Sequence, residues 1–206
     1  MPLLRTDRLE LTAFADDHLS ELHALFTDAE VRRFLLDDAV VPREWVAEEI
    51  RASRDRFAMG IGGIWAVREI GSRSIAGFVG YRHFFEPPDL QLLYGFLPAY
   101  WRRGLAVEAA RAAIRYGFEE LGLPEIHAAA DAPNEASARV LVRLGFKESH
   151  QAGAPEGTRC YVLRRGSSVG LGDRVSAGLG DSASAGLGEP RSPRFIDPRP
   201  PEAPPR

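Results

Sequence analysis

The sequence predicts a mixed α/β domain over residues 1–165, followed by a Gly/Ser/Pro-rich disordered tail over residues 166–206. Strand-like alternation and helix-like periodicity succeed one another in the first range as strand, two helices, three strands, helix, strand, helix and two strands. About a third of the second range is glycine or proline, and an eight-residue unit recurs there at Ser168, Ser176 and Ser184 with too few apolar residues to form a core. With 45% apolar and 27% charged residues, we expect one globular domain.

The sequence of the first half of the domain predicts one strand, then two helices, then three strands. Residues 8–14 alternate in polarity, as a half-buried strand does. Residues 17–27 have apolar side chains at helical spacing, and a second helical pattern starts at Pro42, a residue favoured in the first turn of a helix. Residues 63–70, 74–85 and 90–97 predict three strands, and the Glu-Pro-Pro-Asp sequence at 86–89 predicts a hairpin turn between the last two.

The second half begins with a long amphipathic helix. This helix starts near Arg103, keeps its apolar residues on one face, and ends before Gly122 and Pro124. Residues 125–131 predict a short strand, and residues 134–144 predict a helix that Gly145 ends. Residues 146–150 and 158–163 predict a closing hairpin.

Charge and composition exclude several classes of protein. A net charge of -3 does not favour nucleic-acid binding. The single cysteine, Cys160, excludes an internal disulfide and a multi-thiolate metal site, and we expect it to fill space in a strand. The five histidines lack metal-ligand spacing, so no metal is predicted. Without a signal-peptide segment or an apolar run long enough to span a bilayer, we expect a cytoplasmic protein that binds no membrane.

The most informative stretch is the loop WRRGLA at 101–106, between a strand and the long helix. A helix N-terminus directs free backbone N–H groups and the positive end of its dipole at one point, which suits a pyrophosphate. Gly104 and Ala106 are small enough for phosphates to approach the backbone, and two arginines add charge. An ordinary strand-to-helix turn explains the same residues, so the loop by itself leaves both interpretations open.

The wider pattern resembles the GNAT N-acetyltransferase family and, within it, the ribosomal-protein N-terminal alanine acetyltransferases (the RimJ/RimL-like group). WRRGLA stands where that family has a Gln/Arg-x-x-Gly-x-Gly/Ala acyl-CoA loop, with Trp101 at its first position. LRTDRLEL near the start, GFVGY at 77–81 and NEASARVLVRLGF at 134–146 occur in the expected order across residues 3–164. The resemblance implies a GNAT-type fold, with a mixed, mostly antiparallel sheet, flanking helices and a splayed central strand pair.

The resemblance also implies acetyl-CoA as co-substrate and a set of site residues. The pyrophosphate would lie on the loop residues Arg102, Arg103, Gly104, Leu105 and Ala106, and the pantetheine arm would pair with the strand edge near Phe96 and Leu97. Pantetheine is an amide chain that can bind like an added strand, so it needs an unpaired edge, which strands 90–97 and 125–131 can supply where they diverge.

Two further residues have roles at the predicted thioester. The resemblance places Asn134 beside the pantetheine and makes Ser137 the catalytic residue, which donates a hydrogen bond to the departing thiolate. From the residues alone, Asn134 is also a helix N-cap with Ser137 at the third helical position. The two roles of Asn134 are compatible.

The sequence departs from many relatives at the acid and the base. Leu141 stands where a tyrosine acid is common, and Gln91 where a glutamate base is common. Because an α-amine titrates near about 7.7–8.0 and a lysine amine near about 10.4, a weak base serves an α-amine more easily. We therefore favour an α-amine acceptor. Other candidate bases are Glu86, Asp89 and His83, each of which is also explained as a solvated residue near the hairpin turn.

The favoured function is an acetyl-CoA-dependent N-acetyltransferase acting by direct attack, with a protein N-terminus as the leading acceptor. One alternative is a small-molecule amine, such as an amino acid, polyamine or antibiotic. The other is a degenerate module that binds acyl-CoA without turnover. Trp45 is expected to pack in the core, with a place in the acceptor pocket as its alternative role. The sequence is compatible with a monomer or a homodimer.

Overall fold

The computed structural model describes residues 1–85 and 89–166, and the element order that the sequence predicts is confirmed. The strands are β1 Leu3–Arg5, β2 Leu9–Ala13, β3 Ile64–Glu69, β4 Gly77–Phe84, β5 Asp89–Phe96, β6 Glu125–Asp131, β7 Lys147–Ser149 and β8 Thr158–Arg164. The α-helices are α1 Leu19–Thr27, α2 Ala29–Arg32, α3 Arg43–Ala58, α4 Leu105–Glu119 and α5 Glu135–Arg143. Short 3-10 helices are η1 Asp16–His18, η2 Leu36–Asp38 and η3 Pro98–Tyr100.

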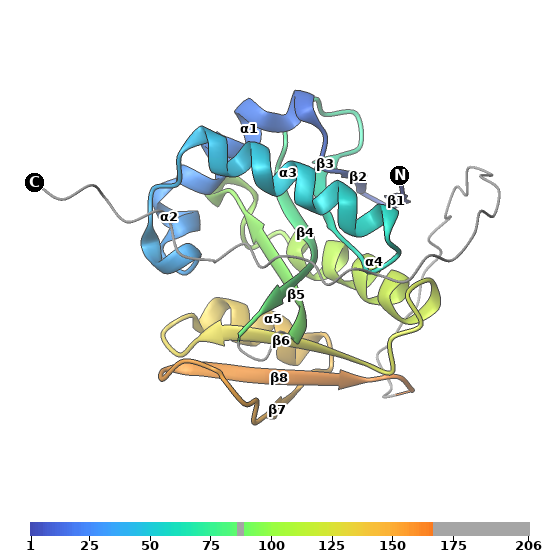
Figure 1. The fold of residues 1–206 in the computed structure, drawn as a ribbon, viewed down its shortest axis with the longest axis vertical. Helices are drawn as coiled ribbons and strands as arrows, with labels where there is room; N and C mark the ends of the chain where they lie inside the picture. The colour runs from blue at the N-terminus through green and yellow to red at the C-terminus, as the bar shows by residue number, and fades with distance from the viewer. Residues whose placement is uncertain (86–88, 167–206) are drawn as a thin grey trace, which may run out of the picture.

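The strands form one eight-stranded sheet in the order β1-β2-β3-β4-β5-β6-β8-β7 (Figure 1). Neighbouring strands are antiparallel except β5 and β6, which are parallel and register at a single residue pair, Gln91 and His127. Beyond that pair the two strands diverge toward their carboxyl ends. The mostly antiparallel sheet with a splayed central pair is therefore confirmed.

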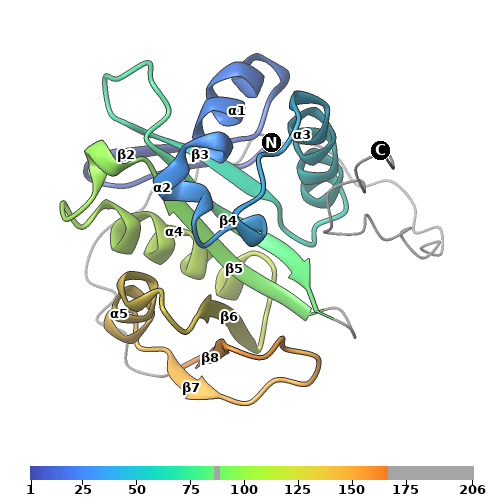
Figure 2. The same ribbon diagram turned by 90° about the vertical axis from the view of Figure 1, so that its left-hand side faces the viewer.

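Helices cover both faces of the sheet and bury two apolar clusters (Figures 1 and 2). On one face, α1 and α3 pack over β3 and β4 around Phe14, Phe26, Ile50 and Phe78. On the other face, α4 and α5 pack around a larger cluster that includes Trp65, Tyr81, Ile114, Leu141 and Tyr161. The odd and even residues of β5 thus meet different helices, because successive strand side chains point to opposite faces.

Short elements were the ones that the sequence did not predict. β1 has three residues, too few for an alternation to be visible, and it exists because β2 pairs with it. The four-residue helix α2 follows Asp28, whose carboxylate accepts from the backbone N–H groups of Glu30 and Val31. The predicted helix at 17–27 is divided into η1 and α1.

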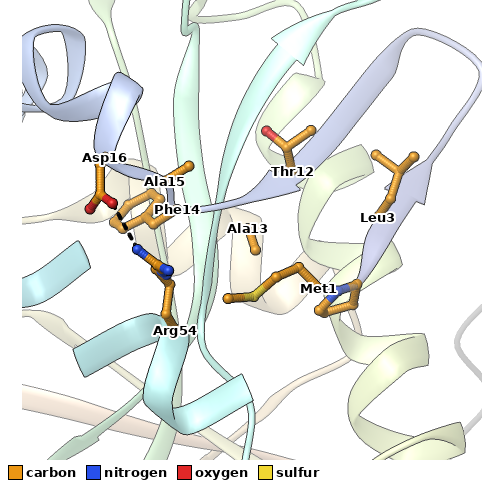
Figure 3. Close-up of a pocket in the computed structure, with 9 residues that line it drawn as sticks. Met1, Leu3, Thr12, Ala13, Phe14, Ala15, Asp16 and Arg54 are labelled. Carbon is orange, nitrogen blue, oxygen red and sulfur yellow. Dashed lines mark hydrogen bonds and ion pairs between the residues drawn. The ribbon is translucent and has the colours of Figure 1, made fainter. Parts of the chain in front are cut away.

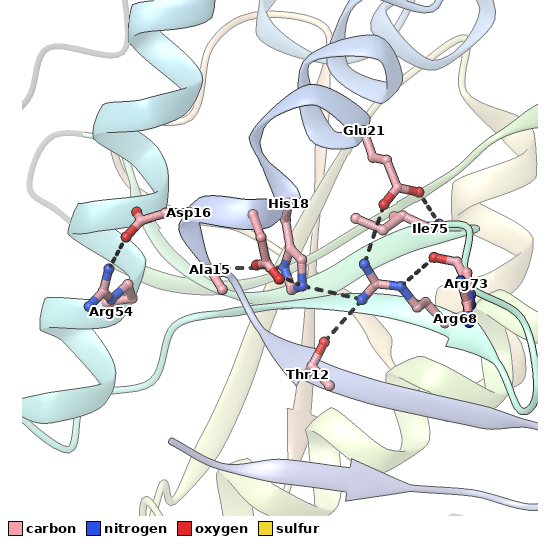
Figure 4. A network of polar contacts seen from close by, with 10 residues as sticks. Thr12, Ala15, Asp16, His18, Glu21, Arg54, Arg68, Arg73 and Ile75 are labelled. Carbon is pink, nitrogen blue, oxygen red and sulfur yellow. Dashed lines mark hydrogen bonds and ion pairs between the residues drawn. The ribbon is translucent and has the colours of Figure 1, made fainter.

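A polar network fixes the start of α1 onto the sheet (Figure 4). The Arg68 guanidinium donates to Thr12 Oγ1 at 3.3 Å, lies 3.3 Å from His18 Nε2 and ion-pairs with Glu21 at 3.4 Å. The Ala15 backbone N–H donates to the other ring nitrogen of His18 at 3.2 Å. Burial, with help from Arg68, lowers the pKa of His18, so the ring serves this network in its neutral form.

Several predicted features lie at the limits of the described residues. The tail at 166–206, apart from Gly166, and Glu86 in the predicted turn lie outside them.

Cys160 is buried in β8 with its thiol free, as predicted. No helix in the described ranges is both long enough and apolar enough to cross a bilayer.

Candidate active site

The divergence of β5 from β6 leaves part of the β5 backbone facing a gap. The Leu97 backbone N–H donates to the Ala76 carbonyl on the β4 side at 3.0 Å. Because backbone groups in a strand point alternately to the two sides, those of Tyr94 and Phe96 face the side away from β4. The Trp101 indole N–H donates to the Phe96 carbonyl at 2.5 Å, which is consistent with that direction. The strand edge expected for an amide-chain ligand is therefore at the backbone of Tyr94 and the N–H of Phe96, since Trp101 already binds the Phe96 carbonyl.

The loop after β5 has the backbone shape of an anion site. Arg102 and Gly104 have left-handed φ values of 59° and 77°. Gly104 caps α4 without a side chain, and the first helical bond runs from the Glu108 N–H to the Gly104 carbonyl at 3.1 Å. The backbone N–H groups just before Glu108 consequently have no partner within the helix. They point with the positive end of the helix dipole into the same space.

Side-chain contacts from Thr6 and Arg8 in the N-terminal segment hold this loop in place. Glu108 accepts hydrogen bonds from Thr6 Oγ1 at 2.5 Å and from Arg8 Nε at 2.7 Å, and the other end of the Arg8 guanidinium donates to the Arg103 carbonyl at 3.0 Å. Burial would raise the pKa of Glu108, but the hydrogen bonds from Thr6 and Arg8 outweigh it and lower the pKa. Glu108 is thus ionised at neutral pH and ties the start of α4 to the LRTDRLEL segment.

These elements border a cleft of about 770 Å³ that runs between α2, the end of β5, the start of α4 and α5. It contains most of the residues that the sequence singled out. Its lining includes Phe96, Arg102, Gly104, Leu105, Ala106, Asn134 and Ser137. Two predicted residues do not line it: the Leu97 side chain packs in the α1/α3 cluster, and the Arg103 guanidinium ion-pairs with Glu69 at 2.5 Å.

Asn134 and Ser137 meet Tyr94 at the start of α5. Asn134 is the N-cap that the sequence predicts, because its Oδ1 accepts from the Ser137 backbone N–H at 3.1 Å. Its amide N–H₂ group stays available to the cleft. The Tyr94 hydroxyl donates to the Ser137 carbonyl at 3.1 Å and lies 3.0 Å from Ser137 Oγ. Asn134 therefore has a structural role and also lines the site.

Tyr94 is a residue that the sequence analysis missed. It lies in a strand whose apolar pattern gave no sign of a polar role, and only the fold brings its hydroxyl to Ser137. Burial raises the pKa of Tyr94 well above its ordinary value, against the opposing effect of the Ser137 hydrogen bond. The hydroxyl therefore stays protonated at neutral pH and can donate a hydrogen bond. Leu141, in contrast, is fully buried in the core and takes no part in the cleft.

A polar cluster lies where β5 and β6 still pair. His127 Nδ1 is 3.1 Å from Asp89 Oδ2, and His127 Nε2 is 3.0 Å from Glu125 Oε1. Gln151, in the segment between β7 and β8, donates to Asp89 and accepts from the Gln91 amide at 3.3 Å. Hydrogen bonds from His127 and Arg164 lower the pKa of Glu125.

The cluster changes the interpretation of Asp89, and the structure also places Gln91 and His83. Asp89 belongs to β5 and is bound to His127, so it is not simply a solvated turn residue. Gln91 is 2% exposed, and its amide has no proton-accepting capacity at neutral pH. His83 is exposed on β4. The sequence could not show the cluster, because Asp89 and Gln151 are 62 residues apart.

The remaining polar and apolar features do not extend the site. Trp45 packs edge-on against Phe26 with ring centroids 5.7 Å apart, and it does not line the cleft. Within residues 1–85 and 89–166, no group of three or more His, Cys, Asp or Glu side chains is placed to hold a metal ion. A separate hollow of about 440 Å³ lies between Met1 and the Asp16–Arg54 ion pair (Figure 3) and contains none of the predicted site residues.

Comparison with known proteins agrees with this geometry. The family model described as an acetyltransferase (GNAT) domain matches residues 8–147. That range includes Arg8 and Glu108, which hold the loop, as well as the loop itself, the strand edge and α5.

Individual proteins are also similar to the chain. The uncharacterized N-acetyltransferase YoaA of Bacillus subtilis is 28% identical over 79% of this chain and 96% of its own. The FsC-acetyl coenzyme A-N(2)-transacetylase of Aspergillus fumigatus is 31% identical over 70% of this chain and 65% of its own. The solved structure of RimL, a ribosomal L7/L12 α-N-protein acetyltransferase in complex with coenzyme A, is similar in fold, with a TM-score of 0.65 at 16% identity over 79% of this chain and 97% of its own.

Proposed function

Because the chain belongs to the GNAT family of acetyltransferases, an N-acetyltransferase family that uses acetyl-CoA, we propose that it acetylates an α-amine, with a protein N-terminus as the leading acceptor. The observation that carries the proposal is the cleft itself. One space brings together a free helix N-terminus, a free strand edge and a pair of hydroxyl groups. Each of these fits a different part of an acyl-CoA.

The residues present fit acetyl-CoA at both ends of the cleft. Backbone N–H groups at the start of α4, with Arg102, fit the pyrophosphate, and Gly104 leaves the approach open because it has no Cβ. The Tyr94 backbone groups and the Phe96 N–H, with the Asn134 amide, fit the amides of pantetheine. Acetyl-CoA supplies the acetyl group as a thioester.

Tyr94 and Ser137 handle the leaving group in this proposal. The pair has two hydroxyl hydrogens, and Tyr94 can donate its own either to the Ser137 carbonyl or to Ser137 Oγ. In the second arrangement the Ser137 hydrogen is free to point into the cleft. As the bond from the acetyl carbon to nitrogen forms and the bond to sulfur breaks, Ser137 donates to the thiolate and Tyr94 supports Ser137. Tyr94 of β5 thereby supplies a hydroxyl group, which the leucine at position 141 cannot.

In this proposal the proton of the attacking amine leaves through the polar cluster that lies where β5 and β6 pair. Asp89 would accept it in place of Gln91 through intervening water, since Asp89 does not line the cleft, and His127 connects Asp89 to Glu125. Such an acceptor suits an α-amine, part of which is neutral near pH 7, better than a lysine amine, which is almost fully protonated.

The experiment is acetyl-CoA-dependent thiol release with a panel of N-terminal peptides and small amines and with no acceptor. The proposal predicts release stimulated by peptides with a free α-amine and not by the same peptides with a blocked N-terminus. Tight acetyl-CoA binding without acceptor-stimulated release across the panel would instead indicate a binding module.

A small-molecule acceptor is the second candidate. The Aspergillus relative carries the name of an enzyme that acetylates FsC at N(2), and it is 31% identical to this chain. The same panel separates the two candidates, because stimulation by small amines in the absence of any response to peptides supports the second.

A further inference from the structure

The arginines of the described residues differ in whether they have an ion-pair partner. Most are ion-paired, through contacts such as Arg5–Glu10, Arg8–Glu108, Arg32–Asp38, Arg54–Asp16, Arg56–Glu49, Arg68–Glu21, Arg103–Glu69 and Arg164–Glu125. The arginines that line the cleft form no ion pair with a described residue, and they are Arg33, Arg102, Arg139 and Arg143. Because the chain is rich in arginine throughout, the number of arginines by itself indicates nothing. Arginines outside the cleft, such as Arg73, also form no ion pair with a described residue, but the cleft brings four of them together.

Four guanidinium groups in one cleft, none of them ion-paired with a described residue, favour a ligand with several negative charges. Against these four cations the lining contains one carboxylate, Glu30. A guanidinium binds phosphate oxygens with two parallel N–H donors, so it is well suited to a phosphate group. Arg33 already stacks on the Phe34 ring at 5.3 Å, and Arg102 belongs to the loop at the start of α4. Arg139 and Arg143 are the two arginines of the cleft for which neither a contact nor a place in the loop has been described.

Arg139 and Arg143 are one turn apart on α5, so they lie on the same helix face. Glu135, one turn before Arg139, would be its natural partner, but the Glu135 carboxylate binds Arg159 at 3.5 Å. Glu148 of β7 also binds Arg159, at 3.1 Å. Arg159 therefore takes two carboxylates near α5 and leaves the charges of Arg139 and Arg143 unneutralised.

The order of residues along α5 gives the pair a place on the ligand. Ser137 lies at the strand edge beside Tyr94, and Arg139 and Arg143 follow it toward the end of the helix. Coenzyme A carries a 3′-phosphate monoester on the ribose that bears its pyrophosphate, and a phosphate monoester is mostly a dianion at pH 7.5. α5 packs against α4, whose N-terminus fits the pyrophosphate. The 3′-phosphate is the anionic group for which no partner has been assigned.

We propose that Arg139 and Arg143 bind the 3′-phosphate of coenzyme A, so that the protein distinguishes coenzyme A from its 3′-dephospho form. This inference rests on the proposed function for the position of the pyrophosphate. It makes two residues of α5, outside the loop at 101–106, responsible for the preference for coenzyme A over its 3′-dephospho form.

The test is calorimetric titration of the whole chain with coenzyme A and, separately, with 3′-dephospho-coenzyme A. The variants are the double substitution Arg139→Gln/Arg143→Gln, Arg33→Gln, and the control Arg73→Gln. Arg73 is exposed outside the cleft, between β3 and β4, and its side chain is also without an ion pair to a described residue. Affinity for the dephospho ligand reports whether each variant is folded.

The wild-type protein, Arg33→Gln and Arg73→Gln should bind coenzyme A at least about tenfold more tightly than the dephospho form, from charge-assisted hydrogen bonds. In the double variant this ratio should fall close to one, with affinity for the dephospho form unchanged. Equal affinities in the wild type, loss of the ratio in Arg33→Gln, or an equal loss for both ligands in the double variant would each overturn the inference. Failure of the wild type to bind either ligand would instead overturn the proposed function.

Discussion

Among single residues, Gly104 gives the most direct test of the phosphate loop. An alanine Cβ there would lie 3.7 Å from Arg8 Nη2, an ordinary contact, so the cost of Gly104→Ala comes from the φ of 77°. Gly104→Glu adds a carboxylate at the proposed pyrophosphate. We expect Gly104→Glu to weaken acetyl-CoA binding at least about a hundredfold and Gly104→Ala by much less, measured by calorimetry.

The control for this comparison is Gly122→Glu. Gly122 follows the opposite end of α4, has a φ of 68°, and has no atom within 4 Å of an added Cβ. It imposes a similar backbone strain far from the cleft. If Gly122→Glu weakened acetyl-CoA binding as much as Gly104→Glu does, the loop assignment would be wrong.

Tyr94 provides the test of the leaving-group chemistry. Tyr94→Phe removes the hydroxyl that contacts Ser137 and should lower kcat by about tenfold or more while leaving the acetyl-CoA dissociation constant unchanged. Tyr100→Phe is the matched control, since Tyr100 lines the same cleft and its ring stacks under Arg103. Steady-state kinetics and calorimetry together separate the two effects, and an unchanged kcat in Tyr94→Phe would contradict the assigned role.

The sequence predicted the structural roles of residues well where those roles depend on close neighbours in the chain. Asn134 was predicted as a cap because the cap contact joins it to Ser137 three residues later, and Gly104 because a helix N-terminus follows it. Tyr94 and Asp89 were missed or undervalued because their partners are distant in sequence. Arg103 looked equivalent to Arg102, and only the fold shows that Glu69 holds it.

At the level of elements, the contact between the N-terminal segment and α4 predicts a pH-dependent stability. Because the folded-state pKa of Glu108 is lowered, its contribution is present above the unfolded-state value of about 4.5 and is lost as pH falls through the folded value. We expect Glu108→Gln to lower the free energy of unfolding by about 1–2 kcal/mol at pH 7 and by less at pH 3 to 4. Urea unfolding at the two pH values measures the difference.

Glu48→Gln is the control, because Glu48 makes only a long, exposed 3.9 Å pair with Arg51 on α3. It should change stability by no more than about 0.5 kcal/mol at either pH. A Glu108→Gln effect that is the same at both pH values would show that the ionised carboxylate is not what holds α4.

Element types and order could be predicted because long segments carry clear periodicity. The helices at α3, α4 and α5 each start at or after a recognisable residue, such as Pro42, Gly104 or Asn134. The divergence of β5 and β6 could not be derived from periodicity, since both strands have ordinary alternation. It was expected only from the resemblance, and the single register pair at Gln91 and His127 establishes it.

For the whole molecule, we expect residues 167–206 to be dispensable. Every strand of the sheet and both apolar clusters lie within residues 1–165. A chain ending at Gly166 should therefore keep its melting temperature and its acetyl-CoA affinity, measured by calorimetry on both forms. A fall of several degrees, or a substantially weaker affinity, would show that the domain extends into the tail.

The most direct test of the proposed function is the position of acetylation on one peptide that has both a free α-amine and an internal lysine. At pH 7 with acetyl-CoA, mass spectrometry should find the label on the α-amine at a rate at least about tenfold above that on the lysine, since the lysine amine is almost fully protonated. Comparable rates at the two amines, or labelling of the lysine alone, would contradict the account.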